Sequence, residues 1–194
     1  MLRQDGTQQI AHAKYYSLPI ETPRAFVELQ LHAVEKRVKA PAKARSSEPP
    51  ETQIASFIAK FTPEMASKIK SLRAALRTQF PTAWELVYDN YNFLVFGFCT
   101  TPRSSDCIVS LAANSKGAVL SFYYGTSVHD PHNLLLGSGN QNRFIRLEST
   151  AILEIPEVRE LIAAATAHAR TPLPAHGTGA TVIQSISAKQ RPRR

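Results

Sequence analysis

Three short apolar runs constrain the fold of this chain more than any other feature. They cover residues 93–99, 107–113 and 118–124, and only hairpin-sized links separate them. Aromatic and β-branched residues fill these runs, and each run is shorter than a typical buried helix, so they favour strands. Links of this length join antiparallel neighbours. The sequence therefore predicts a β-meander, and a fourth strand is predicted over residues 144–147.

An amphipathic helix is predicted before the strands. Thr62 can cap its start, and Pro81 marks its end. Its apolar positions recur every three or four residues, as expected for a helix that packs on a core. These positions are Met65, Ile69, Leu72, Leu76 and Phe80. We interpret residues 82–88, which follow Pro81, as another helix end.

Shorter helical segments are predicted elsewhere. One covers residues 52–61, another begins at Pro156, and Asp130-Pro131 opens a short helical turn. Helices at both ends of an antiparallel sheet indicate an α+β domain. We therefore expect a small antiparallel sheet of about four strands packed against helices.

Composition divides the 194 residues into three parts. Residues 1–50 form an N-terminal extension with moderate helical character over 24–39, and residues 40–50 read as a Pro/Ala/Ser-rich linker. Residues 51–168 hold the predicted domain. Residues 169–194 combine prolines, glycines and a basic end, which predicts a disordered basic tail.

The net charge of +8 is unevenly distributed. Residues 51–167 hold ten Lys or Arg and ten Asp or Glu, whereas residues 168–194 hold five Lys or Arg and no acid. Nucleic-acid modules usually carry a basic face on the fold itself. The charge therefore points to the tails as the basic regions, not to the predicted domain.

The sequence favours a cytoplasmic protein. No window approaches the apolar length of a membrane span, and the first residues lack the apolar run of a signal peptide. Cys99 and Cys107 are too few for a disulfide framework. We expect no membrane association and reduced thiols.

An ordered series of short motifs runs through residues 52–166. The motifs are Glu85-Leu-Val-Tyr88, Ser105-Asp-Cys-Ile-Val109, Leu120-Ser-Phe-Tyr-Tyr-Gly125, Asp130-Pro131, Leu134-Leu-Leu-Gly-Ser-Gly139, Arg143-Phe-Ile-Arg-Leu147 and Pro156-Glu-Val-Arg-Glu-Leu161. In this order they resemble a YdhG-like domain, a family of unknown function. The resemblance implies a small antiparallel sheet backed by helices. Some members are described as frataxin-like intracellular iron chaperones, so it also implies iron binding through surface carboxylates and delivery to iron-recipient proteins.

Glu85, Asp89 and Asp106 are the candidate metal ligands. Glu85 and Asp89 are four residues apart and would share one face of a helix, while Asp106 begins the second predicted strand. Carboxylates that converge at a sheet edge could bind Fe(II) through oxygen. The alternative is that all three are solvated charges.

The histidines and cysteines support weaker hypotheses. His129 and His132 flank the Asp130-Pro131 turn, which explains them without a metal. Cys99 and Cys107 lie at facing ends of a predicted hairpin and are interpreted as buried thiols. No catalytic signature is evident, so a binding protein is favoured over an enzyme. The hypothesis that the protein is an enzyme stays open, because the region around Glu85, Tyr88 and Asp106 could line a pocket.

The alternative function is binding of a small anion or nucleic acid. Arg143 and Arg146 are the candidate contacts, together with the basic tail. Strand alternation sends positions 143 and 146 to opposite faces, so only a bulge or a strand end would let them converge. Aromatic residues on the strands could stack bases, although core packing is the preferred interpretation.

Overall fold

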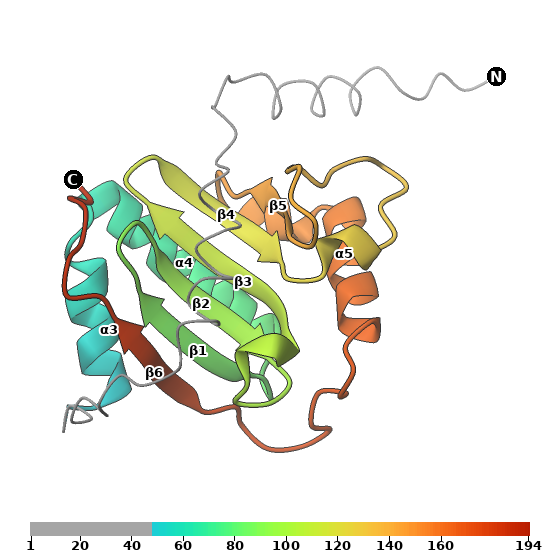
Figure 1. The fold of residues 1–194 in the computed structure, drawn as a ribbon, viewed down its shortest axis with the longest axis horizontal. Coiled ribbons are helices and arrows are strands. Elements are labelled where there is room, and N and C mark those ends of the chain that lie inside the picture. The colour runs from blue at the N-terminus through green and yellow to red at the C-terminus, as the bar shows by residue number, and fades with distance from the viewer. Residues whose placement is uncertain (1–47) are drawn as a thin grey trace.

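The computed structural model describes residues 48–194, which form an α+β fold (Figure 1). The predicted helical segment over 24–39 and nearly all of the linker lie outside the described residues. Within the described part, six strands form one sheet in the order β5-β4-β3-β2-β1-β6. Their bounds are β1 Trp84–Asp89, β2 Leu94–Cys99, β3 Cys107–Asn114, β4 Gly117–Phe122, β5 Arg143–Arg146 and β6 Thr181–Ile186.

The predicted meander is confirmed. The three apolar runs form β2, β3 and β4, and the predicted fourth strand forms β5. Neighbours from β1 to β5 pair antiparallel, whereas β6 pairs parallel to β1. The expectation of about four antiparallel strands is therefore wrong in two respects, because the sheet is mixed and has two further strands at one edge.

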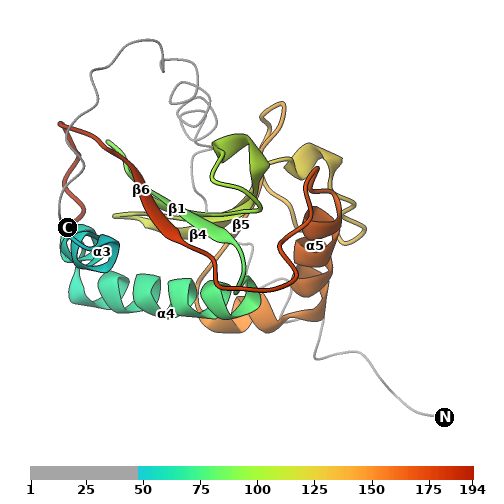
Figure 2. The same ribbon diagram turned by 90° about the horizontal axis from the view of Figure 1, so that it is seen from below.

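Three helices lie on the same face of the sheet (Figure 2). They are α3 Pro50–Ile58, α4 Pro63–Gln79 and α5 Pro156–Ala167. Thr62 caps α4 as predicted, since its Oγ1 accepts a hydrogen bond from the backbone N of Met65 at 3.3 Å. None of the helices between residues 48 and 194 is long and apolar enough to cross a membrane.

The main core lies between these helices and the sheet. The predicted apolar stripe of α4 supplies Ile69, Leu72 and Leu76, all fully buried. Phe96, Leu111 and Leu120 meet them from the sheet. Large apolar side chains packed on both sides of this layer give the fold most of its stability. We call this side of the sheet the helix face.

The segment interpreted as a helix end is strand β1. Its side chains alternate, with Trp84, Leu86 and Tyr88 on one side and Glu85, Val87 and Asp89 on the other. The two acids hide the strand pattern because they lie on the helix face, where a strand usually presents apolar residues. Cations from the helical layer and from the end of the described chain neutralise them there, so tertiary contacts decide the conformation.

The predicted disordered tail contains strand β6. Thr181–Ile186 pairs with β1, and the residues before it approach the sheet closely. A Cβ on Gly179 would lie only 1.7 Å from the carbonyl oxygen of Ala83, so that position requires glycine. The Thr-Val-Ile run at 181–183 has high β-propensity. The prolines and glycines before it favour disorder, and the prediction followed them.

The predicted helical turn at Asp130 is a loop. Its carboxylate accepts hydrogen bonds from the backbone N of Leu134 at 3.0 Å and of Leu135 at 2.8 Å. Asp130 therefore caps backbone donors as expected, but no helix follows. Gly137 has a φ of +113°, a conformation that glycine adopts without strain.

The second face of the sheet has a different composition. It presents Trp84, Leu86, Tyr88, Val95, Cys99, Cys107, Ala112, Val119 and Tyr123. The pairing of β4 with β5 adds Phe144 opposite Ser121 and Arg146 opposite Val119. Within residues 48–194, none of the three α-helices lies on this face (Figure 2).

Candidate functional site

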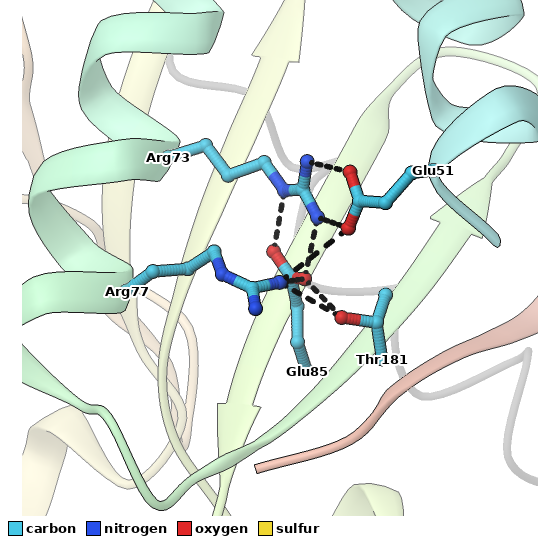
Figure 3. A network of polar contacts seen from close by, with 5 residues as sticks. All are labelled: Glu51, Arg73, Arg77, Glu85 and Thr181. Carbon is cyan, nitrogen blue, oxygen red and sulfur yellow. Dashed lines mark hydrogen bonds and ion pairs between the residues drawn. The ribbon is translucent and has the colours of Figure 1, made fainter. Parts of the chain in front are cut away.

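Glu85, a predicted iron ligand, is buried in an ion-pair network on the helix face (Figure 3). Arg73 donates from Nε to Oε1 and from Nη2 to Oε2, each at 2.7 Å. Arg77 Nη1 and Thr181 Oγ1 also contact Oε2, both at 2.8 Å. These donors occupy the carboxylate oxygens that a metal would need.

Arg73 is the centre of that network. Its Nη1 and Nη2 also form a bidentate pair with Glu51, at 2.8 and 2.7 Å. Burial lowers the pKa of Arg73, but its hydrogen bonds to Glu85 and Glu51 outweigh burial and raise the pKa above its usual value. The hydrogen bond from Arg73 lowers the pKa of Glu51. The network therefore links α3, α4, β1 and β6 through charge-assisted hydrogen bonds.

Asp89, the second predicted ligand, is fully buried in another group of cations. Lys60 Nζ lies 2.5 Å from Oδ2, and Arg193 Nη1 lies 2.5 Å from Oδ1. Gln190 Nε2 donates to Oδ2 at 2.6 Å. Asp89 therefore anchors the end of the described chain to β1.

Asp106 lies in a third environment. It ends the 3₁₀ turn Ser104–Asp106, accepts a hydrogen bond from Thr101 Oγ1 at 2.5 Å, and lies 3.5 Å from Arg103 Nε. Positions 85 and 89 are about 13 Å apart along a strand, too far to share one ion. Among residues 48–194, no group of three or more His, Cys, Asp or Glu side chains is placed to hold a metal.

The histidines and cysteines also have local explanations. His132 Nε2 lies 3.5 Å from Glu160. Cys99 and Cys107 are cross-strand partners and both are buried, so the predicted proximity is confirmed. A hydrogen bond with Cys107, together with burial, raises the pKa of the Cys99 thiol. A neutral buried thiol is a weak nucleophile.

The two arginines of the alternative hypothesis do not converge. Arg143 pairs with Phe122 of the core, and its Nη1 donates to the carbonyls of Gly139 and Asn142 at 2.5 and 2.8 Å. Arg146 lies on the second face, as the odd spacing requires. Arg143 thus holds the loop before β5, and the two arginines lie on opposite faces, as strand alternation predicts.

A hollow of about 550 Å³ lies at the end of the sheet where β3 turns into β4. Phe93, Val119, Leu136 and Phe144 contribute an apolar lining. The volume is within the range of pockets that bind small organic ligands. By contrast, the hollow that Asp106 and His168 border measures only about 20 Å³, close to the space of one water.

Four cations from four separate segments border the larger hollow. Lys68 comes from α4, Lys116 from the β3–β4 turn, Arg146 from β5, and Arg191 from the segment after β6. Glu148 is the one acid in this lining among the described residues. Asn92 also borders the hollow, and its Oδ1 is buried without a hydrogen-bond partner within the described part of the chain. The lining thus combines positive charge with polar and apolar surface.

Two contacts fix Arg191 beside the hollow. Its backbone N donates to the carbonyl of Tyr91 at 2.9 Å, and its guanidinium carbon lies 5.5 Å from the centre of the Tyr91 ring. Sequence reasoning treated this residue as part of a disordered tail. Only the pairing of β6 with β1 brings it back to the sheet, so no local signal could have placed it beside the hollow.

No family model matches this chain, and no curated protein or solved structure matches it either. The resemblance to YdhG-like domains and the iron-binding role drawn from it therefore stay predictions.

Proposed function

We propose that this protein binds a small organic anion in the hollow at the β3–β4 end of the sheet. One observation carries the proposal: Lys68, Lys116, Arg146 and Arg191 come from four separate segments and border one partly apolar hollow. Like charges gathered in this way repel one another, and an anionic ligand would offset that repulsion.

The chemistry of the lining indicates the ligand class. A guanidinium such as Arg146 or Arg191 matches the geometry of a carboxylate or phosphate better than an ammonium does. Phe93 and Phe144 offer aromatic surface to the rest of the ligand. The Oδ1 of Asn92 can accept one further hydrogen bond, for example from a hydroxyl or amino group of the ligand. We infer a ligand with one acidic group attached to an apolar or aromatic body.

Titration calorimetry with three probes tests this proposal. The probes are adenosine monophosphate, 2-naphthoate and inorganic phosphate. We expect saturable binding of at least one organic probe that exceeds binding of inorganic phosphate. The Arg146→Gln variant should weaken that binding about tenfold, the loss expected for one charge-assisted contact of about 1.4 kcal/mol.

Lys189→Gln is the matched control, because it removes one exposed positive charge close to Arg191 without changing the lining of the hollow. It should leave the affinity unchanged. Equal losses in both variants would show attraction by net charge alone and would contradict a specific site. Tighter binding of a single-stranded oligonucleotide, with a steep dependence on salt, would show that the ligand is nucleic acid and not a small organic anion.

Iron binding through Glu85, Asp89 and Asp106 is not part of this proposal. The first two carboxylates are paired with arginine or lysine, and the third lies apart from them. Fe(II) titration of the wild type and of the Glu85→Gln/Asp106→Asn double variant tests that prediction directly.

A further inference from the structure

The segment after β6, residues 187–194, continues along the β1 edge toward the hollow (Figure 1). We call this segment the clasp. It contains no helix or strand, so its contacts with the rest of the fold hold it in place. Ser187 N donates to the carbonyl of Asp89 at 2.9 Å. Arg191 N donates to the carbonyl of Tyr91, also at 2.9 Å. The clasp therefore carries Arg191 to the border of the hollow.

Asp89 anchors the clasp on both sides of Arg191. Gln190, one residue before Arg191, donates from Nε2 to Asp89 Oδ2 at 2.6 Å. Arg193, two residues after it, is only 4% exposed, and its Nη1 lies 2.5 Å from Asp89 Oδ1. The guanidinium carbon of Arg193 also lies 5.2 Å from the centre of the Phe61 ring. These contacts form a strong anchor, because a buried carboxylate that loses its partner costs far more free energy than an exposed ion pair does.

The anchors act on the hollow from outside it. Asp89, Gln190 and Arg193 are not among the described residues that line the hollow, whereas Arg191 is. The side chain of Arg191 lies over the ring of Tyr91, which is 41% exposed. A contact at such a position contributes little by itself. The place of Arg191 beside the hollow therefore depends on the anchors that flank it.

Docking of the clasp also has an electrostatic cost. It brings Arg191 to a hollow that Lys68, Lys116 and Arg146 already border, and like charges repel one another. The attraction between Asp89 and the clasp therefore works against repulsion among the cations of the hollow. An anion in the hollow removes part of that repulsion, so it favours the docked clasp.

We propose that Asp89 and Arg193 are positioning residues of the anion site, and that docking of the clasp and binding of the anion are coupled. This inference rests on the proposed function, since it acts through Arg191 on the same hollow. A docked clasp raises the affinity for the anion, and by reciprocity the bound anion stabilises the docked clasp. The affinity of the site is thus set in part by a buried ion pair that the ligand does not touch.

A double-mutant cycle on the full-length protein tests whether Arg193 acts through Arg191. Titration calorimetry uses adenosine monophosphate or 2-naphthoate, whichever the wild type binds more tightly. Arg191→Gln should weaken binding about tenfold and Arg193→Gln about fivefold, whereas the double variant should bind within about twofold of Arg191→Gln. Losses that multiply in the double variant would show that the two residues act independently and would overturn the proposal.

Lys189→Gln is the matched control, because it removes one exposed positive charge from the same segment. It should leave the affinity unchanged. A loss as large as that of Arg193→Gln would assign the effect to net charge and would overturn the positioning role.

Hydrogen exchange measured by mass spectrometry follows docking of the clasp separately from affinity. The amides of residues 187–194 should exchange at least about tenfold faster in Arg193→Gln than in the wild type. A saturating concentration of the probe should slow their exchange in the wild type but not in Arg191→Gln. Gln190→Ala is a milder variant, because Asp89 keeps Lys60 and Arg193 as partners. It should shift affinity and exchange in the same directions by smaller amounts, with the fold checked by circular dichroism.

The outcomes distinguish this inference from the proposed function. If the wild type binds neither organic probe, the proposed function fails, and the coupling fails with it. If the wild type binds and Arg193→Gln exchanges faster at unchanged affinity, the coupling alone is overturned. Unchanged exchange in both Arg193→Gln and Gln190→Ala would overturn the role of Asp89 as the anchor.

Discussion

The two faces of this sheet use the same strands for different purposes. On the helix face, the chain buries large aliphatic and aromatic residues together with two acids, and arginine or lysine neutralises each acid. On the second face, smaller and aromatic residues lie among the cysteines, and Arg146 lies toward the end of the sheet that borders the hollow. Adjacent positions on a strand therefore differ in role, because alternate side chains point to opposite faces.

The difference shows that a buried charge and a candidate binding charge can lie on neighbouring elements without sharing a function. Glu85 and Asp89 are surrounded by donors and fix the edge of the sheet. Lys116 and Arg146 border a hollow large enough for a ligand. The carboxylates that suggested metal binding thus contribute to the stability of the fold, and the cations suggest where a ligand binds.

The largest effect is expected from breaking the ion-pair network of the helix face. Glu85→Ala removes the buried partner of Arg73 and Arg77 and should lower the free energy of unfolding by about 3–5 kcal/mol. Urea denaturation followed by circular dichroism measures this change.

Glu51→Ala is the control for that variant, because Glu51 contacts the same Arg73 but 62% of its side chain is exposed. Its cost should stay within about 1 kcal/mol, as for other exposed pairs. Equal losses in the free energy of unfolding for the two variants would show that burial does not make the Glu85 ion pair more important than the Glu51 ion pair.

Neighbouring residues of β4 compare the two faces directly. Leu120 is fully buried on the helix face, and Leu120→Ala should cost about 2–5 kcal/mol, because it leaves a cavity. Val119 is half-buried on the second face, and Val119→Ala should cost about 1 kcal/mol or less. Urea midpoints of the two variants check the difference, and a larger loss at Val119 would reverse the assignment of the core.

The smallest expected effect is a loss of folding stability at alkaline pH, which comes from Cys99 on the second face. The hydrogen bond with Cys107, together with burial, raises the pKa of Cys99 in the folded protein. The stabilisation from this neutral thiol is complete below the pKa of an unfolded cysteine, about 8.5, and is lost as pH rises further. We expect the urea midpoint to fall between pH 7.5 and pH 9.5. Cys99→Ala should reduce that fall, and an identical fall in both proteins would assign it to other groups.

Local patterns were sufficient for the central part of the fold. The α4 stripe, the Thr62 cap, the apolar runs of β2 to β4 and the start of α5 at Pro156 were all predicted, because each depends on neighbours within a few residues. Strand β1 was missed, because the partners that neutralise Glu85 and Asp89 are distant in sequence. Strand β6 was missed, because its pairing partner is nearly a hundred residues away.

The candidate site was predictable only in part. The sequence predicts Arg146 and the basic end of the chain as contacts for an anion, and Arg146 and Arg191 both border the hollow. Arg143 was placed in the same role, but it holds a loop instead. The contributions of Lys68, Lys116 and Asn92 have no sequence signature, because an isolated cation or amide in a polar segment usually faces solvent.

The amino-acid sequence by itself determined the α+β class, the meander, the amphipathic helices and the proximity of Cys99 to Cys107. These follow from short-range periodicity, capping and hairpin-length links. The tertiary structure alone decided that β6 pairs with β1, that the acids of β1 are neutralised, and that four distant cations border one hollow. Such features depend on contacts between segments far apart in the chain, and local preference carries no information about which segments meet.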